Sequence, residues 1–142
     1  MKVYADASFL VSLYYLDAHS AEAERRMRRS VPAPLLTPLA ELELINALEL
    51  RLSRWEASAA EIQAAKNIFE KDIHDAVYST APMPATVYQL ARQISTRKSS
   101  VLGTRTLDIL HVACASLLGA ESFWTFDDRQ AQLARAEGLK VR

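Results

Sequence analysis

Three aspartates stand at positions where folding alone does not call for a charge. Asp6 follows a short apolar run at residues 3–5, and Asp127 follows another at residues 122–126. Asp108 lies in the first turn of a predicted apolar helix. Burying a carboxylate costs on the order of several kcal/mol unless a cation, a metal or a proton offsets the charge. Carboxylate oxygens are the hard ligands that Mg²⁺ and Mn²⁺ prefer, so the three aspartates are candidates for a divalent-metal site.

A fourth acidic candidate comes from the helix predicted to begin at Pro38, which carries Glu41 and Glu43. Successive helical residues turn by about 100°, so these two glutamates lie about 200° apart and cannot both face one site. Asn46 lies on the same side of the helix as Glu43, which makes these two the favoured polar pair. The same pattern predicts that this helix buries a stripe that includes Leu39, Leu42, Ala47 and Leu50.

The elements that must position these side chains alternate along the chain. Short apolar segments alternate with helical ones, which is typical of an α/β fold with a parallel sheet covered by helices on both faces. In such sheets, ligands bind beyond the carboxyl ends of the strands, where Asp6 and Asp127 are placed. We expect four or five strands, at residues 3–5, 35–37, 78–80, 122–126 and 139–141.

Helical periodicity and capping residues predict the intervening helices. Ser58 and Glu61 form a capping box at the start of one of them. The helix that carries Asp108 begins at Thr104 or Thr106, ends before Gly119 and has almost no polar face, so we expect it to be buried. The predicted helices cover residues 8–16, 21–29, 39–55, 58–77, 85–95, 104–118 and 128–137.

Basic residues occur in local groups. The segment at residues 96–106 is rich in Ser, Thr and Gly and is predicted to be a connector. Its Arg97, Lys98 and Arg105 lie close in sequence to Asp108, as a basic lip for an anionic polymer would, although a solvated loop is an equal interpretation. The four arginines at residues 25–29 are better explained as cations at a helix C-terminus than as an RNA or partner surface.

The amino-acid composition limits the classes of protein to which this sequence can belong. The 142 residues suit one domain, and half of them are hydrophobic. Seventeen basic residues balance seventeen acidic ones, so only local charge could attract nucleic acid. The single cysteine, Cys114, is expected to be a core thiol in a reducing compartment. The sequence contains neither a transmembrane stretch nor a signal peptide, and we expect a cytoplasmic protein that does not enter membranes.

Four motifs, in this order, resemble one known family. They are the opening KVYADASFLVSLYY, Glu-x-x-Asn-Ala-Leu at residues 43–48, RTLDILHVACASLLGAESFWTFDDRQ at residues 105–130, and the closing LARAEGLKV. Together they resemble the PIN-domain ribonucleases, in particular the VapC-like toxins of bacterial toxin–antitoxin pairs. The likeness runs end to end, and it favours Glu43 over Glu41 and Asp127 over Asp128.

The resemblance implies a metal-dependent endoribonuclease with Mg²⁺ or Mn²⁺ as cofactor. Its catalytic and metal-binding residues would be Asp6, Glu43, Asp108 and Asp127, supported by Ser8, Asn46 and Thr125. His111 also recurs in the family pattern, but in a buried helix a core role is favoured over direct chemistry. A site of this kind needs no side-chain nucleophile, because a metal ion can activate water and polarise the phosphoryl oxygen.

The resemblance also implies partners. These are RNA as substrate, an antitoxin protein that covers the acidic site, and a second copy of the chain in a homodimer. The candidate contact surfaces are the early helix, with Phe9, Leu10, Leu13 and Tyr14, and the Glu43 helix, although core packing is the favoured role of any one of these residues.

Three other kinds of protein were weighed. A receiver domain would carry an acidic pair after the first strand, and an Asp-x-Asp phosphatase would have an acid in place of Ser8. The sequence fits neither. A catalytically silent PIN-like module that binds RNA or a protein stays open as an alternative.

Overall fold

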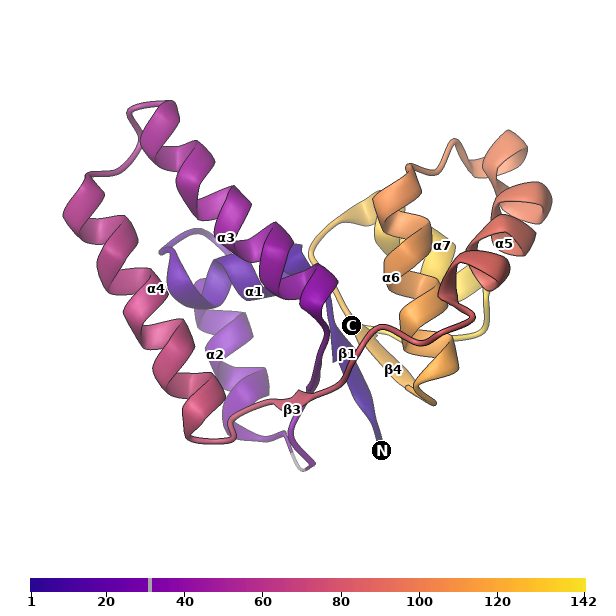
Figure 1. The fold of residues 1–142 in the computed structure, drawn as a ribbon, viewed down its shortest axis with the longest axis horizontal. Coiled ribbons are helices and arrows are strands. Elements are labelled where there is room, and N and C mark those ends of the chain that lie inside the picture. The colour runs from indigo at the N-terminus through magenta and orange to yellow at the C-terminus, as the bar shows by residue number, and fades with distance from the viewer. Residues whose placement is uncertain (31) are drawn as a thin grey trace.

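The computed structural model describes residues 1–30 and 32–142. Short parallel strands alternate with helices, as the sequence pattern predicts (Figure 1). In chain order the elements are β1 (Val3–Ala5), α1 (Ala7–Tyr14), α2 (Ser20–Arg28), β2 (Leu35–Leu36), α3 (Pro38–Ser53), α4 (Ala59–His74), β3 (Ser79–Thr80), α5 (Val87–Leu102), α6 (Thr106–Leu117), β4 (Ser122–Trp124), α7 (Asp128–Ala136) and β5 (Lys140–Val141).

The sheet has five strands in the order β3-β2-β1-β4-β5, and every pairing is parallel. The central strand, β1, pairs with β2 on one side and with all three residues of β4 on the other. The chain builds outward through β2 and β3 on one side, and β4 and β5 lie on the other side. The boundary between β1 and β4 is therefore the switch point at which open α/β sheets bind ligands.

Helices cover both faces of the sheet because alternate strand residues point to opposite faces. Val3 and Ala5 of β1 belong to the core under α1 to α4, whereas Tyr4 belongs to the core under α5 to α7. Trp124 and Phe123 of β4 divide between the two cores in the same way. Figure 1 shows α1 to α4 on one side of the sheet and α5 to α7 on the other.

The polar segment at residues 96–106 is mostly helical, so the predicted connector was wrong. Helix α5 runs to Leu102, and Gly103 ends it in the left-handed conformation with φ of 64°. Hydroxyl contacts run from Ser95 to Ser99 and from Ser99 to Thr104 across the end of the helix. Arg97 and Lys98 therefore lie on a helix. Helix α6 also begins differently, since Arg105 occupies the N-cap position without a side-chain capping bond.

The buried face of α3 differs from the predicted stripe. Ala40, Leu44 and Leu48 are the buried residues, while Leu42 is 66% exposed and Leu50 is 39% exposed. The helix carries leucines at so many positions that more than one stripe of helical period fits its sequence. Thr37, predicted as the end of the preceding strand, is instead the N-cap and accepts a hydrogen bond from the Ala40 amide.

Other predicted features are present. Ser58 and Glu61 form the capping box of α4, and Cys114 is fully buried. Helix α6 is buried from Asp108 to Ala115, although Leu107 and Leu117 at its ends are exposed. Among the described residues, no helix combines the length and apolarity needed to cross a membrane.

Candidate active site

A cavity of about 320 Å³ opens at the carboxyl edge of the sheet, between β1 and β4. All four predicted acids line it, although they come from four separate elements. Asp6 follows β1, Glu43 lies on α3, Asp108 lies in the first turn of α6, and Asp127 precedes α7. The remaining lining residues are Ala7, Ser8, Arg105, Thr106, Leu107 and His111.

Asp6 is the most buried of the four acids, with 4% of its surface exposed. It is the N-cap of α1, and its Oδ1 accepts hydrogen bonds from the Phe9 amide at 3.0 Å and from Ser8 Oγ at 2.7 Å. Burial raises the pKa of the Asp6 carboxyl, and Thr125, His111 and Ser8 partly offset this effect. The carboxylate is thus fixed in orientation at the N-terminal end of a helix.

Asp108 and Asp127 share one cation, Arg105. The guanidinium donates from Nε to Asp108 Oδ2 at 2.9 Å and from Nη2 to Asp127 Oδ2 at 3.1 Å. Asp127 also caps α7 by accepting from the Arg129 and Gln130 amides. Hydrogen bonding to Asp108 is the main cause that raises the pKa of Arg105. A positive charge therefore already lies between two of the four acids.

Glu43 is held by His111, which has the buried core position predicted for it and whose two ring nitrogens both have partners. Nε2 of His111 lies 2.7 Å from Glu43 Oε2, and Nδ1 lies 2.8 Å from the Tyr4 hydroxyl. That hydroxyl also lies 3.1 Å from Thr37 Oγ1. The signals in the sequence were the position of His111 one turn after Asp108 and its place in the family pattern, whereas the partners that define its role lie far away in the chain.

The predicted supporting hydroxyls join the two strand ends. Ser8 Oγ lies 3.1 Å from Thr125 Oγ1 and accepts a hydrogen bond from the Phe126 amide. Thr125 Oγ1 accepts from the Asp127 amide at 3.0 Å. These contacts tie the residues after β1 to those after β4, and they hold Asp6 and Asp127 in one place.

Other predicted residues lie outside this cavity. Asn46 is exposed and does not line it, although it was paired with Glu43 from helical phase. Arg97 and Lys98 do not line it either, and Arg97 forms an ion pair with Glu137. Arg105 is the only one of the three predicted basic contacts that reaches the acids.

The donor chemistry of the cavity suits a divalent cation, because four carboxylates supply hard oxygen ligands. In the part of the chain that the structure describes, however, no three Asp, Glu, His or Cys side chains are arranged to hold a metal ion. Arg105 lies between two of the acids, so its displacement would be part of metal binding.

Residues 3–136 match the family model described as the PIN domain. The chain belongs to the PIN domain family. None of the curated proteins matches it in sequence.

Solved structures of PIN proteins share this fold. VapC20 of Mycobacterium tuberculosis, described as a toxin that cleaves the sarcin–ricin loop, is 20% identical with a TM-score of 0.71, and the match covers 99% of this chain and 98% of that one. FitAcB of Neisseria gonorrhoeae is 14% identical with a TM-score of 0.68, over 99% and 96% of the chains. VapBC2 of Rickettsia felis, bound to a promoter DNA fragment, is 14% identical with a TM-score of 0.67, over 100% and 98%.

Proposed function

We propose that this PIN protein is a metal-dependent endoribonuclease and the toxin of a cytoplasmic toxin–antitoxin pair. The observation that carries the proposal is the convergence of Asp6, Glu43, Asp108 and Asp127 on one cavity at the switch point of the sheet. Four carboxylates that repel one another need a cation to be stable when ionised. The toxin role rests on the similarity in fold to VapC20, VapBC2 and FitAcB.

The acids would bind Mg²⁺ or Mn²⁺, which supplies activation of water and stabilisation of the leaving oxyanion. The surrounding residues fix the carboxylates beforehand. Ser8 and the Phe9 amide orient Asp6, and His111 orients Glu43. Arg105 would leave Asp108 and Asp127 when a metal ion takes its place.

RNA cleavage in Mg²⁺ tests the catalytic proposal. Wild type should cut RNA, and both Asp6→Asn and the addition of EDTA should abolish cutting. Mg²⁺ should also raise the melting temperature of wild type, and Asp108→Asn should reduce that rise. An RNA-binding protein without nuclease activity and without a metal-dependent rise in melting temperature would instead be the catalytically silent module.

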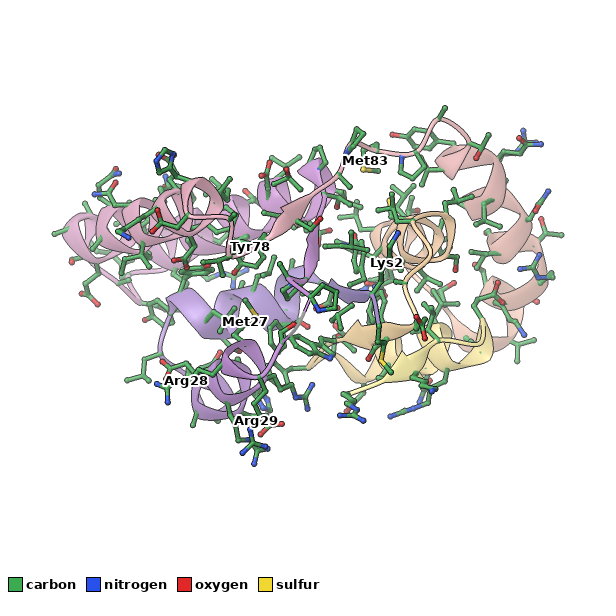
Figure 2. All side chains as sticks on the ribbon, turned by 90° about the horizontal axis from the view of Figure 1, so that it is seen from below. Lys2, Met27, Arg28, Arg29, Tyr78 and Met83 are labelled. Atoms are coloured by element: carbon green, nitrogen blue, oxygen red, sulfur yellow. The ribbon has the colours of Figure 1, made fainter. Side chains whose placement is uncertain are left out.

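An antitoxin is the proposed partner, and a cavity beside α1 is its proposed binding place. Phe9 and Leu10 of α1 are fully buried and cannot touch a partner, so this part of the predicted surface was wrong. Leu13 and Tyr14 line a cavity of about 400 Å³ between α1, α2 and α4. Figure 2 labels Met27 and Tyr78, two other residues that line it. Expression of the chain alone should be toxic to bacteria, and co-expression with the antitoxin should not.

A homodimer is the remaining part of the proposal. Leu42 and Leu50 lie on the outer side of α3, and Trp55 follows the helix almost fully exposed. Large apolar side chains gathered on a surface favour self-association. Light scattering should give twice the monomer mass, and Leu42→Gln with Trp55→Gln should return the protein to a monomer.

Arg97 and Lys98 stay proposed RNA contacts. They would act from the surface of α5. Charge reversal at both positions should weaken cleavage without changing the metal-dependent rise in melting temperature.

A further inference from the structure

A second cavity, of about 400 Å³, is lined by four arginines and one acid. Arg25, Arg26 and Arg29 come from α2 and its end, and Arg142 follows β5. Trp124 of β4 and Glu22 complete the lining. We call this cavity the arginine pocket. Figure 2 shows Arg29 projecting from the end of α2. Guanidinium groups from two separate segments thus surround one cavity.

The arginine pocket contains more guanidinium N–H donors than its single acid can use. Glu22 is its only acid, and it forms ion pairs with both Arg25 and Arg26. The hydrogen bond from Arg26 lowers the pKa of Glu22, so this acid stays ionised. Arg29 and Arg142 also line the pocket and form no ion pair with any described residue. A planar guanidinium without a carboxylate partner is suited to a phosphate, which accepts two parallel hydrogen bonds.

Aromatic side chains lie between the arginine pocket and the cavity lined by the four acids, which we call the acidic cavity. Trp124 lines the arginine pocket, and Asp127, three residues later, lines the acidic cavity. Three residues span at most about 10 Å of extended chain. Between them, Phe126 stacks against the exposed ring of His19, with centroids 4.4 Å apart and planes 9° apart. The guanidinium carbon of Arg26 lies 5.5 Å from the centre of the same Phe126 ring.

We propose that single-stranded RNA runs from the acidic cavity across the exposed His19 ring, which Phe126 supports from beneath, and places its phosphates in the arginine pocket. The inference rests on the proposed nuclease function, and it names the surface along which the RNA substrate of that nuclease lies. Positive grooves with aromatic side chains for bases to stack on are how proteins hold single strands. An acidic peptide would use the arginines but would gain nothing from the stacked rings, so RNA is favoured. This path gives a further role to the arginines at residues 25–29, which the sequence explained as cations at a helix C-terminus.

Binding can be measured without cleavage, by fluorescence anisotropy of a labelled 12-nucleotide RNA of mixed sequence in EDTA. Arg25→Gln with Arg29→Gln removes two exposed guanidiniums. It should weaken binding at least tenfold and reduce the log–log salt slope by about 1.4, or about 0.7 per lost contact. His19→Ala should weaken binding roughly fivefold or more through lost stacking. The matched control is Arg54→Gln with Arg135→Gln, two exposed arginines at the end of α3 and on α7, which should change binding less than twofold.

Each outcome has a definite meaning. Equal weakening by the two double variants, or no weakening by either, would overturn the proposed path. Competition by poly-glutamate as strong as that by RNA, with no effect of His19→Ala, would assign the pocket to an acidic protein and also overturn it. If wild type cuts RNA in Mg²⁺ and the Arg25/Arg29 variant cuts equally well, the path is wrong and the nuclease function stands. If wild type neither binds nor cuts RNA, both fail.

Discussion

His111 Nε2 lies 2.7 Å from Glu43 Oε2 inside a chain of hydrogen bonds that begins at Thr37. An ionised glutamate only accepts, so Nε2 carries the proton and Nδ1 accepts from the Tyr4 hydroxyl. The Tyr4 oxygen can then accept from Thr37. Each hydrogen bond in this chain is therefore donated in the same direction. The chain runs from Thr37 at the N-cap of α3, through Tyr4 and His111 in the core, to Glu43 on the same helix.

Removing the imidazole should break this chain at its centre. His111→Leu removes the acceptor that the buried Tyr4 hydroxyl uses and the donor that holds Glu43, and it leaves the hydroxyl with Thr37 as its one neighbour in the chain of hydrogen bonds. Each buried group left unsatisfied costs about 1–3 kcal/mol. Tyr4→Phe should also destabilise the protein, since it leaves Nδ1 of the buried imidazole without its donor but keeps the contact of His111 with Glu43. Denaturant unfolding of both variants gives the free energies, and a His111→Leu variant as stable as wild type would contradict the network.

Arg105 should compete with metal ions for Asp108 and Asp127. Its side chain is 57% exposed, and exposed ion pairs contribute up to about 1 kcal/mol. Arg105→Gln should therefore tighten Mn²⁺ binding by up to roughly fivefold and lower the melting temperature in EDTA. Calorimetric titration with Mn²⁺ measures the first effect. Weaker Mn²⁺ binding in the variant would mean that Arg105 assists the metal site.

Asp6→Asn should stabilise the metal-free protein while it abolishes activity. The carboxylate is buried beside other acids, whereas an asparagine can still cap α1 through its side-chain oxygen. In EDTA the gain should exceed the roughly 0.5 kcal/mol that is usual for a surface change. Asp128→Asn, at an exposed neighbour of Asp127, is the control. A destabilised Asp6→Asn would show that the charge is compensated within the fold.

The two faces of α3 should respond differently to truncation. Leu44→Ala removes a fully buried side chain and should cost about 2–5 kcal/mol. Leu42→Ala should change the free energy of unfolding by about 0.5 kcal/mol or less in the monomer. Urea unfolding at low protein concentration compares them. Similar losses of unfolding free energy in the two variants would support the buried stripe predicted from the sequence.

The Cys114 thiol should be unreactive in the native protein. It is fully buried, and burial raises its pKa from 9.0 to about 11. Alkylation at pH 8 should therefore require unfolding. The unfolded thiol ionises at lower pH than the folded one, so between pH 9 and 11 wild type should lose stability relative to Cys114→Ala. Rapid native alkylation would place the thiol at the surface.

The strand-end acids were predictable because a local pattern defines them. An apolar run followed by an aspartate fixes Asp6 and Asp127 at one edge of a parallel sheet. The choice of Glu43 over Glu41 depended on the family resemblance and on a pairing with Asn46, which lies outside the cavity. Leucine spacing could not choose the buried stripe of α3, since the answer depends on which face meets the sheet. The contacts of Arg105 with Asp127 and of His111 with Tyr4 join residues far apart in the chain, and nothing in the local sequence encodes them.

The hydroxyl contact between Ser8 and Thr125 has a consequence for synthesis. The two residues are 117 positions apart, and the sheet places them side by side through the pairing of β1 with β4. At about 5–20 residues per second, the ribosome adds Thr125 roughly 6 to 23 s after Ser8. Until then β1 has no β4 partner and Asp127 does not exist. A nascent chain therefore carries Asp6 long before the four-acid cavity can close, because the closing requires β4 and Asp127.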